Sequence, residues 1–247
     1  MSIAAGFVCS DGLVVCADTQ IGTDQFKYYE SKIFPINLSP ASGAVLLAYA
    51  GLPAIMKVIH EDFRKRVEDQ TKTCSEVRVH LQETLESVLT KESSERHQML
   101  CAICDGESRI LLKTENQYIS PVPWWDCVGF GDSALTRYLV GIFWRSGLGL
   151  SIEQAEILCA YLIAQAKKYV QWVGGYTNIT ALTENGTVRP FYWTEAQDAD
   201  FDIFEYVISR LVNVLANRRS SGGDCGKAIN DFSRYLIELR AKWTGRY

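Results

Sequence analysis

The residues at the start of the chain, Met1 and Ser2, have types that could carry chemistry. Methionine aminopeptidase commonly removes an initiator Met that precedes a small residue, so we expect Ser2 to become a free N-terminus. A terminal serine combines a hydroxyl nucleophile with an α-amine, whose ordinary pKa of about 7.7 to 8.0 suits a base near neutral pH. The alternative is that Ser2 is an ordinary second residue without a catalytic role.

The eight cysteines and three histidines show no metal-binding pattern. Only Cys101 and Cys104 lie close together, in an apolar run from 99 to 104 that is typical of a strand. Residues three apart on a strand point to opposite faces, so we expect two buried structural thiols. The sequence therefore predicts no metal and no other cofactor.

Composition narrows the possible partners. The chain has 247 residues, of which 47% are hydrophobic, and its 25 basic and 29 acidic residues give a net charge of -4. This balance provides no excess of positive charge that would favour binding to nucleic acid or to an anionic membrane surface. Asp11 and Asp18 interrupt the first apolar runs, which argues against a signal peptide, and no run approaches the ~18 apolar residues of a membrane helix. We expect a cytoplasmic protein.

Hydrophobic periodicity predicts alternating groups of strands and helices. The runs 3–9 and 13–17 flank an Asp-Gly turn and indicate a hairpin, and a polar stretch from Thr19 to Glu30 follows. Further strands are expected at 31–36, 44–50, 98–104, 109–113, around 127–129, at 178–183 and at 187–191. Helices are expected at 55–67, 77–88, 133–143, 152–170, 201–215 and 227–243. This order favours a layered α+β architecture.

Several short motifs occur in an order that resembles a known family. They are Asp11-Gly12 with Asp18-Thr19, Ser31-Lys32-Ile33, Ala48-Tyr49-Ala50-Gly51, Val128-Gly129-Phe130-Gly131 and Gly174-Gly175. From about Ser2 to Phe191 the chain resembles proteasome β subunits and bacterial relatives such as HslV, which are N-terminal-nucleophile (Ntn) hydrolases. The resemblance implies a four-layer αββα sandwich in a single domain spanning residues 1–247, with a less family-like helical extension from about 199 to 247.

The resemblance also implies catalytic roles. Ser2 corresponds to the catalytic N-terminal residue, whose hydroxyl attacks an amide carbonyl while its own α-amine accepts the proton. The ammonium group of Lys32 would lower the pKa of that amine, and Asp18 would hold Lys32 charged and oriented. The backbone N–H of Gly51 would stabilise the oxyanion, and Gly22 and Tyr49 would contact the substrate.

The sequence departs from the family at positions that normally support the nucleophile. Phe130, Val170 and Val173 stand where the resemblance implies polar side chains, and Asp132 and Ser133 are candidate substitutes. Ser2 also replaces the usual threonine and so lacks a γ-methyl group. These departures put catalytic efficiency in question, because supporting hydrogen bonds set the geometry of a site.

The resemblance predicts a peptidase subunit that cleaves peptide or unfolded protein substrates inside a homo-oligomeric ring, with an ATPase unfoldase as a possible partner. Two alternatives stay open. One is a catalytically silent, ring-forming scaffold of the same fold, favoured by the three departures. The other is an Ntn amidase that acts on a small amide.

Overall fold

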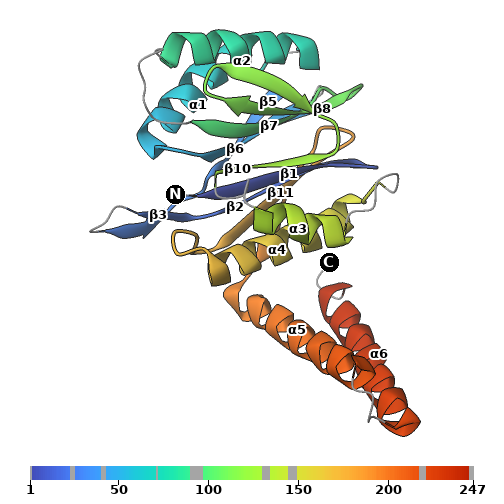
Figure 1. Ribbon diagram of the computed structural model, residues 1–247. Helices are drawn as coiled ribbons and strands as arrows, with labels where there is room; N and C mark the ends of the chain where they lie inside the picture. The colour runs from blue at the N-terminus through green and yellow to red at the C-terminus, as the bar shows by residue number, and fades with distance from the viewer. Residues whose placement is uncertain are drawn as a thin grey trace. The chain divides into compact units, whose positions relative to one another are not determined.

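The computed structural model describes residues 2–22, 26–39, 43–70, 72–89, 97–129, 134–143, 149–216 and 221–244. These residues form six helices and twelve strands (Figure 1). The chain divides into two compact units, Met1–Trp193 and Thr194–Tyr247. None of the helices in the described ranges combines the length and apolar character that spanning a membrane requires.

The first sheet holds the strands that carry Asp18 and follow Ser2. Its five antiparallel strands lie in the order β10 (Trp125–Gly129), β1 (Ile3–Cys9), β2 (Gly12–Asp18), β11 (Thr177–Thr183) and β12 (Val188–Trp193). The predicted hairpin is confirmed, since β1 and β2 pair up to Cys9 and Gly12. The pairing places Ile3 opposite Gly129 and Asp18 opposite Thr177.

The second sheet is also antiparallel and five-stranded. Its order is β5 (Ile33–Ser39), β6 (Gly43–Ala50), β7 (Gln98–Cys104), β8 (Arg109–Glu115) and β9 (Tyr118–Val122). Alternate residues of each strand point to opposite faces. Cys101 accordingly joins one core cluster and Cys104 another, which confirms that the two thiols lie on opposite faces of a strand.

A third sheet is a two-stranded ribbon of β3 (Gln20–Gly22) and β4 (Lys27–Tyr29). All three residues of β4 are exposed, so this ribbon is not a layer of the core. The predicted four-layer αββα sandwich is therefore wrong: the described chain has three antiparallel sheets, and the last two helices belong to a separate unit. That expectation came from the family resemblance. The hydrophobic pattern could not have corrected it, because the pattern identifies strands but does not reveal which of them share a sheet.

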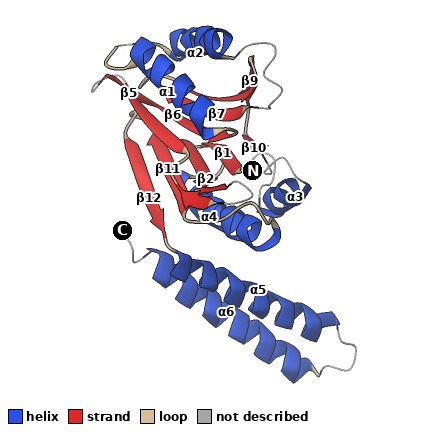
Figure 2. Ribbon diagram, turned by 90° about the vertical axis from the view of Figure 1, so that its left-hand side faces the viewer, coloured by secondary structure: helices blue, strands red, loops and turns tan. Residues whose placement is uncertain are grey.

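Two helices, α1 (Pro53–Val67) and α2 (Cys74–Val88), cover the outer face of the second sheet (Figure 2). Their buried residues, including Met56, Phe63 and Leu81, pack with Leu47 and Tyr49 of β6 in one core cluster. A second cluster fills the space between the two large sheets, with small side chains such as Ala4, Ala17 and Ala48. Small residues there allow the two sheets to approach closely next to Asp18.

The helices α3 (Ala134–Phe143) and α4 (Ile152–Tyr169) lie on the face of the first sheet that points away from the second sheet (Figure 1). α4 packs mainly against β2 and β11. It begins with the predicted N-cap, because Ser151 Oγ accepts a hydrogen bond from Gln154 N, and Ser151 N in turn donates one to Gln154 Oε1. This capping box fixes where α4 starts.

The second unit is a helical hairpin of α5 (Glu195–Ala216) and α6 (Gly222–Thr244). Asp200 of α5 makes two contacts with α6. Its backbone oxygen accepts a hydrogen bond from Tyr235 Oη at 2.8 Å, and its carboxylate forms an ion pair with Lys242. Both helices extend further than the expected ranges of 201–215 and 227–243. Whether they are an extension of a single domain stays a prediction.

Candidate active site

Asp18 and Lys32 form an ion pair in the interior of the first unit. Asp18 is the last residue of β2, and Lys32 immediately precedes β5. Lys32 Nζ lies 2.7 Å from Asp18 Oδ1, and neither side chain is exposed. Burial lowers the pKa of Lys32, although the carboxylate of Asp18 acts in the opposite direction. The ammonium is thus a buried, poorly solvated acid close to the start of β1.

The carboxylate of Asp18 links three segments of the chain. Its Oδ1 atom also accepts a hydrogen bond from Ile3 N at 3.0 Å, and its Oδ2 atom accepts one from Gly174 N at 3.3 Å. A buried carboxylate requires such donors, because an unpaired charge in the interior is very costly. Asp18 consequently holds the first strand, Lys32 and the Gly174 loop in one fixed arrangement.

Ser2 directly precedes Ile3, the residue that donates to Asp18, and is 7% exposed. Its carbonyl lies against Gly129, where a Cβ atom would stand only 2.2 Å from Ser2 O. Gly129 also has φ +71°, a left-handed value that favours glycine. These contacts place the backbone of Ser2 next to the Asp18–Lys32 pair, and Met1 lies outside the described residues.

The Gly174–Gly175 loop closes one side of this arrangement. Thr19 N and Gln20 N both donate to Gly174 O, at 3.3 and 3.0 Å, and Tyr176 N donates to Thr19 Oγ1 at 2.7 Å. Gly175 has φ +74°, and a Cβ atom there would lie 2.4 Å from Thr19 Oγ1. The glycine pair therefore allows the loop to approach the end of β2 closely.

Gly51 and Gly22, the two glycines with a predicted role in the site, lie at the ends of strands. Gly51 directly follows β6, at an exposed bend, and Gly22 is the last residue of β3 and is half-buried. A Cβ atom at Gly22 would make only ordinary contacts, the nearest with Phe26 O at 3.6 Å. The oxyanion role of Gly51 and the substrate role of Gly22 stay predictions.

Tyr49 lies in β6 and is wholly buried in the core cluster beneath α1. Its ring stacks on Phe34 with 5.7 Å between centroids. Within the described part of the chain, its hydroxyl has no hydrogen-bond partner. Burial raises the pKa of this hydroxyl above its ordinary value, and the nearby charge of Glu30 adds to the effect. Its contact with a substrate stays a prediction.

Of the three positions that depart from the family pattern, the structure describes Val170 and Val173 but not Phe130. Val170 is the C-cap residue of α4, and Val173 is buried at 4% exposure, directly before Gly174. An apolar side chain thus precedes the glycine whose N–H reaches Asp18. Phe130 and its candidate substitutes, Asp132 and Ser133, lie outside the described residues.

The structure adds contacts that sequence reasoning missed. Lys32 Nζ donates to Gln20 O at 2.6 Å, and Gln98 Oε1 accepts from Gly129 N at 2.7 Å. Gln20 contributes its backbone carbonyl, which every residue has, so its residue type could not indicate this contact. Gln98 at the start of a buried strand was a detectable signal, because a polar side chain there needs a partner.

No group of three or more His, Cys, Asp or Glu side chains in the described ranges is arranged to hold a metal ion. The absence of a cofactor stays a prediction. The described site consists of a buried cation, a carboxylate that orients it, and a serine backbone fixed next to both.

No protein-family model matches the chain, and no curated protein sequence matches it. Solved structures do match it. A Gly-1 mutant of Anbu from Hyphomicrobium sp. strain MC1 has a TM-score of 0.72 at 12% identity, covering 85% of this chain and 97% of its own. Anbu from Yersinia bercovieri, described as an ancestral beta-subunit, has a TM-score of 0.70 at 15% identity, covering 87% and 97%. The fold resembles that of Anbu.

A third match is the helical assembly of the Anbu complex from Pseudomonas aeruginosa, with a TM-score of 0.71 at 14% identity, covering 89% of this chain and 97% of that one. The assignment to proteasome β subunits and HslV has to be corrected, because these matched structures are Anbu proteins. The short motifs behind that assignment describe turns and strand ends, which are properties of a fold and do not separate its branches. Identities of 12% to 15% establish the fold and not the activity.

Proposed function

We propose that this protein is an N-terminal-nucleophile hydrolase that cleaves peptide bonds, with Ser2 as nucleophile after removal of Met1. The observation that carries the proposal is the double use of Asp18 Oδ1, which accepts from Lys32 Nζ at 2.7 Å and from Ile3 N at 3.0 Å. One carboxylate oxygen thus joins the buried ammonium to the residue that follows Ser2. An ion pair that served only to stabilise the fold would not need this hydrogen bond to the start of the chain, so the bond supports a role in the site.

The proposed reaction needs no cofactor. Ser2 Oγ attacks the carbonyl carbon of the scissile amide while the α-amine of Ser2 accepts its proton. The N–H of Gly51 stabilises the oxyanion, and the amine then passes the proton to the leaving nitrogen as the C–N bond breaks. Water, deprotonated by the same amine, then attacks the acyl carbon, and the amine returns the proton to Ser2 Oγ as the bond between Oγ and the acyl group breaks. The charge of Lys32 favours the neutral, basic form of the amine through like-charge repulsion.

The proposal extends to substrate and assembly. Gly22 and Tyr49 are proposed to contact the substrate, a peptide or an unfolded protein segment. Since the Pseudomonas aeruginosa Anbu complex is a helical assembly, we propose that this chain also forms a homo-oligomer. A closed ring, an ATPase unfoldase partner and a cytoplasmic location belong to the same proposal, as does the treatment of residues from about 199 to 247 as an extension of a single domain.

Covalent labelling tests the proposal. Purified full-length protein is incubated with a peptide β-lactone, whose strained carbonyl traps a nucleophilic hydroxyl as a stable ester. We expect one label per chain, loss of the label in Ser2→Ala, and retention in the matched control Ser120→Ala, which removes a hydroxyl from β9. Labelling that persists in Ser2→Ala would contradict the assignment of the nucleophile.

A silent scaffold is the second candidate, and the buried apolar side chain of Val173 next to Gly174 favours it. Under this hypothesis, assembled protein that has lost Met1 takes up no label. Comparing turnover of unfolded peptides with that of small amides then separates a peptidase from an amidase among active samples.

A further inference from the structure

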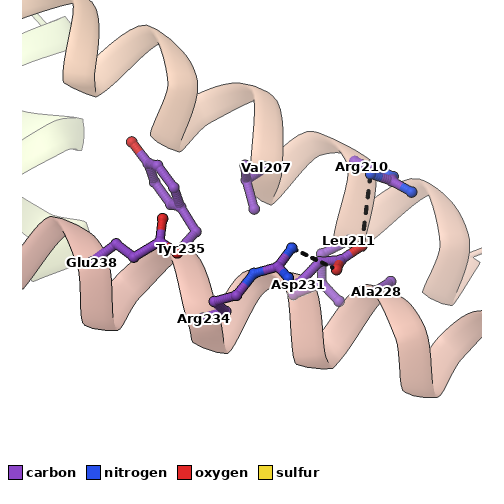
Figure 3. A pocket seen from close by; sticks show the side chains of 8 residues that line it. All are labelled: Val207, Arg210, Leu211, Ala228, Asp231, Arg234, Tyr235 and Glu238. Carbon is purple, nitrogen blue, oxygen red and sulfur yellow. Dashed lines mark hydrogen bonds and ion pairs between the residues drawn. The ribbon is translucent and has the colours of Figure 1, made fainter.

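The groove between α5 and α6 is lined by charges that balance one another (Figure 3). Its volume is about 210 Å³, and the carboxylate of Asp231 lies 3.8 Å from Arg210 Nη1 and 3.3 Å from Arg234 Nη2. Glu238 supplies the second acidic group of the lining. Exposed ion pairs of this kind contribute little to stability, and two arginines with two acids leave no excess charge to select a ligand. The contacts of Gln98, a polar side chain of the first unit, instead involve the surroundings of Ser2.

Two backbone N–H groups next to Ser2 donate to side chains. Ile3 of β1 lies opposite Gly129 of β10. Ile3 N donates to Asp18 Oδ1 at 3.0 Å, and Gly129 N donates to Gln98 Oε1 at 2.7 Å. A buried backbone N–H needs such an acceptor. Since Ile3 follows Ser2 and Gly129 lies against the Ser2 carbonyl, Asp18 and Gln98 hold the backbone on two sides of Ser2.

Gln98 belongs to the sheet that does not contain Ser2. It is the first residue of β7 and lies opposite Ala50, the last residue of β6, which Gly51 directly follows. Its hydrogen bond to Gly129 therefore joins the second sheet to the first. The fit at this point is close, because a Cβ atom at Gly129 would overlap Ser2 O and lie 2.6 Å from Ala50 Cβ. Gly129 is thus held between Ser2 and the end of the strand that leads to Gly51.

The orientation of the Gln98 amide is determined from both ends. Its Nε2 atom donates to Glu115 Oε1 at 3.5 Å, and Glu115 lies opposite Gln98 on β8. An ionised carboxylate only accepts hydrogen bonds and a backbone N–H only donates. The amide oxygen must therefore face Gly129, and the amide nitrogen must face Glu115.

We propose that Gln98 is a positioning residue that fixes the separation between Ser2 and the N–H of Gly51. The inference rests on the proposed function, in which Ser2 is the nucleophile and Gly51 stabilises the oxyanion. Ser2 precedes β1 of the first sheet, and Gly51 follows β6 of the second, so their separation depends on how the two sheets are held together beside them. A misplacement of ~1 Å at a reacting group can slow a reaction about 100-fold.

The kinetics of labelling by the peptide β-lactone test this role in full-length protein. Gln98→Met keeps the length of the side chain but removes the acceptor, so we expect the maximal labelling rate to fall about 100-fold. The probe concentration that gives half of this rate should stay unchanged, because probe binding is not affected. Gln82→Met is the matched control: it removes a half-buried amide of α2 that donates to Glu86 Oε1, and it should label like the wild type. A wild-type maximal rate in Gln98→Met would overturn the proposal.

An exchange of donor and acceptor distinguishes positioning from a general effect on stability. The double variant Gln98→Glu with Glu115→Gln keeps an acceptor for Gly129 N and a hydrogen bond between positions 98 and 115. We expect it to recover most of the wild-type maximal rate. A purely structural role would lower the thermal midpoint of Gln98→Met but leave the labelling rate of its folded molecules unchanged. Failure of the folded double variant to recover the rate would also overturn the proposal.

Amide hydrogen exchange at Gly129 gives a readout that does not depend on activity. We expect the Gly129 N–H to exchange faster in Gln98→Met than in the wild type, and to regain its protection in the double variant. A wild-type chain that takes up no label would contradict the proposed function. Faster exchange at Gly129 would even then support the link between the sheets, whereas equal exchange in wild type and Gln98→Met would overturn it.

Discussion

Asp18 and Lys32 form a wholly buried ion pair, with 2.7 Å between Asp18 Oδ1 and Lys32 Nζ. Removing one member of such a pair leaves an uncompensated charge in the interior. The pair therefore affects both the stability of the first unit and the electrostatics next to Ser2.

We predict that Lys32→Met lowers the free energy of unfolding by about 3–5 kcal/mol and abolishes labelling of Ser2. Urea denaturation of full-length protein measures the first effect. Lys57→Met is the matched control, because Lys57 pairs with Glu30 at the same 2.7 Å but is 50% exposed. The control should leave stability close to that of the wild type, because ion pairs between exposed side chains contribute little. Equal losses in the two variants would contradict the special position of Lys32.

Adding Asp18→Asn to Lys32→Met should cost less than the sum of the two single changes, because the double variant contains no unpaired buried charge. The double-mutant cycle isolates the coupling between the two side chains. Strict additivity would show that the two groups act independently.

Gly129→Ala should displace Ser2, since a Cβ atom at Gly129 would lie 2.2 Å from Ser2 O and the backbone has φ +71°. We expect strong loss of labelling together with lower thermal stability. Gly141→Ala is the control: it lies in α3 with nothing within 4 Å of the added atom, so the change should be neutral or stabilising by about 1 kcal/mol. Wild-type labelling in Gly129→Ala would argue against this positioning role.

Asp105 should make stability depend on pH. Burial acts to raise its pKa, but backbone N–H groups that donate to its carboxylate lower the pKa from 3.8 to about 2. These donors belong to Cys74, Glu107 and Ser108. Because the folded pKa is the lower one, the carboxylate contributes stability above pH 3.8, and the contribution disappears as the pH falls through about 2.

Asp105→Asn should therefore lower the urea midpoint at pH 7, and its difference from the wild type should shrink below pH 4. Glu107→Gln, an exposed change in the same turn, should match the wild type throughout. A difference for Asp105→Asn that stays constant from pH 7 to pH 3 would contradict the ionic origin of the effect.

The sequence predicted the buried strands well, because their patterns are strong. The hairpin at Asp11–Gly12 and the opposite-facing thiols of Cys101 and Cys104 both depend on local geometry with a fixed period. The ribbon of β3 and β4 was missed, since a polar stretch of three-residue strands has no hydrophobic period to detect. β9 was missed as well, and only one of its five residues, Val122, is buried.

In the candidate site, the sequence motifs singled out Asp18 and Lys32, and the structure places these two side chains in contact. The sequence could not reveal that Gln20 supplies its carbonyl to Lys32, because every residue has a carbonyl. Nor could it reveal that Tyr49 lies beneath α1, since the direction of a side chain depends on which face of the sheet each helix covers.

The central claim is that one residue, Ser2, supplies both a hydroxyl and a free amine, and a peptide epoxyketone tests it most directly. This probe has two adjacent electrophilic carbons, so a terminal serine can bond to it through Oγ and through the α-nitrogen, closing a ring and adding the full mass of the probe. Mass spectrometry of the purified chain should show loss of Met1, one adduct per chain, and both bonds on Ser2. A chain that keeps Met1 in all molecules, or an adduct on any other residue, would contradict the account.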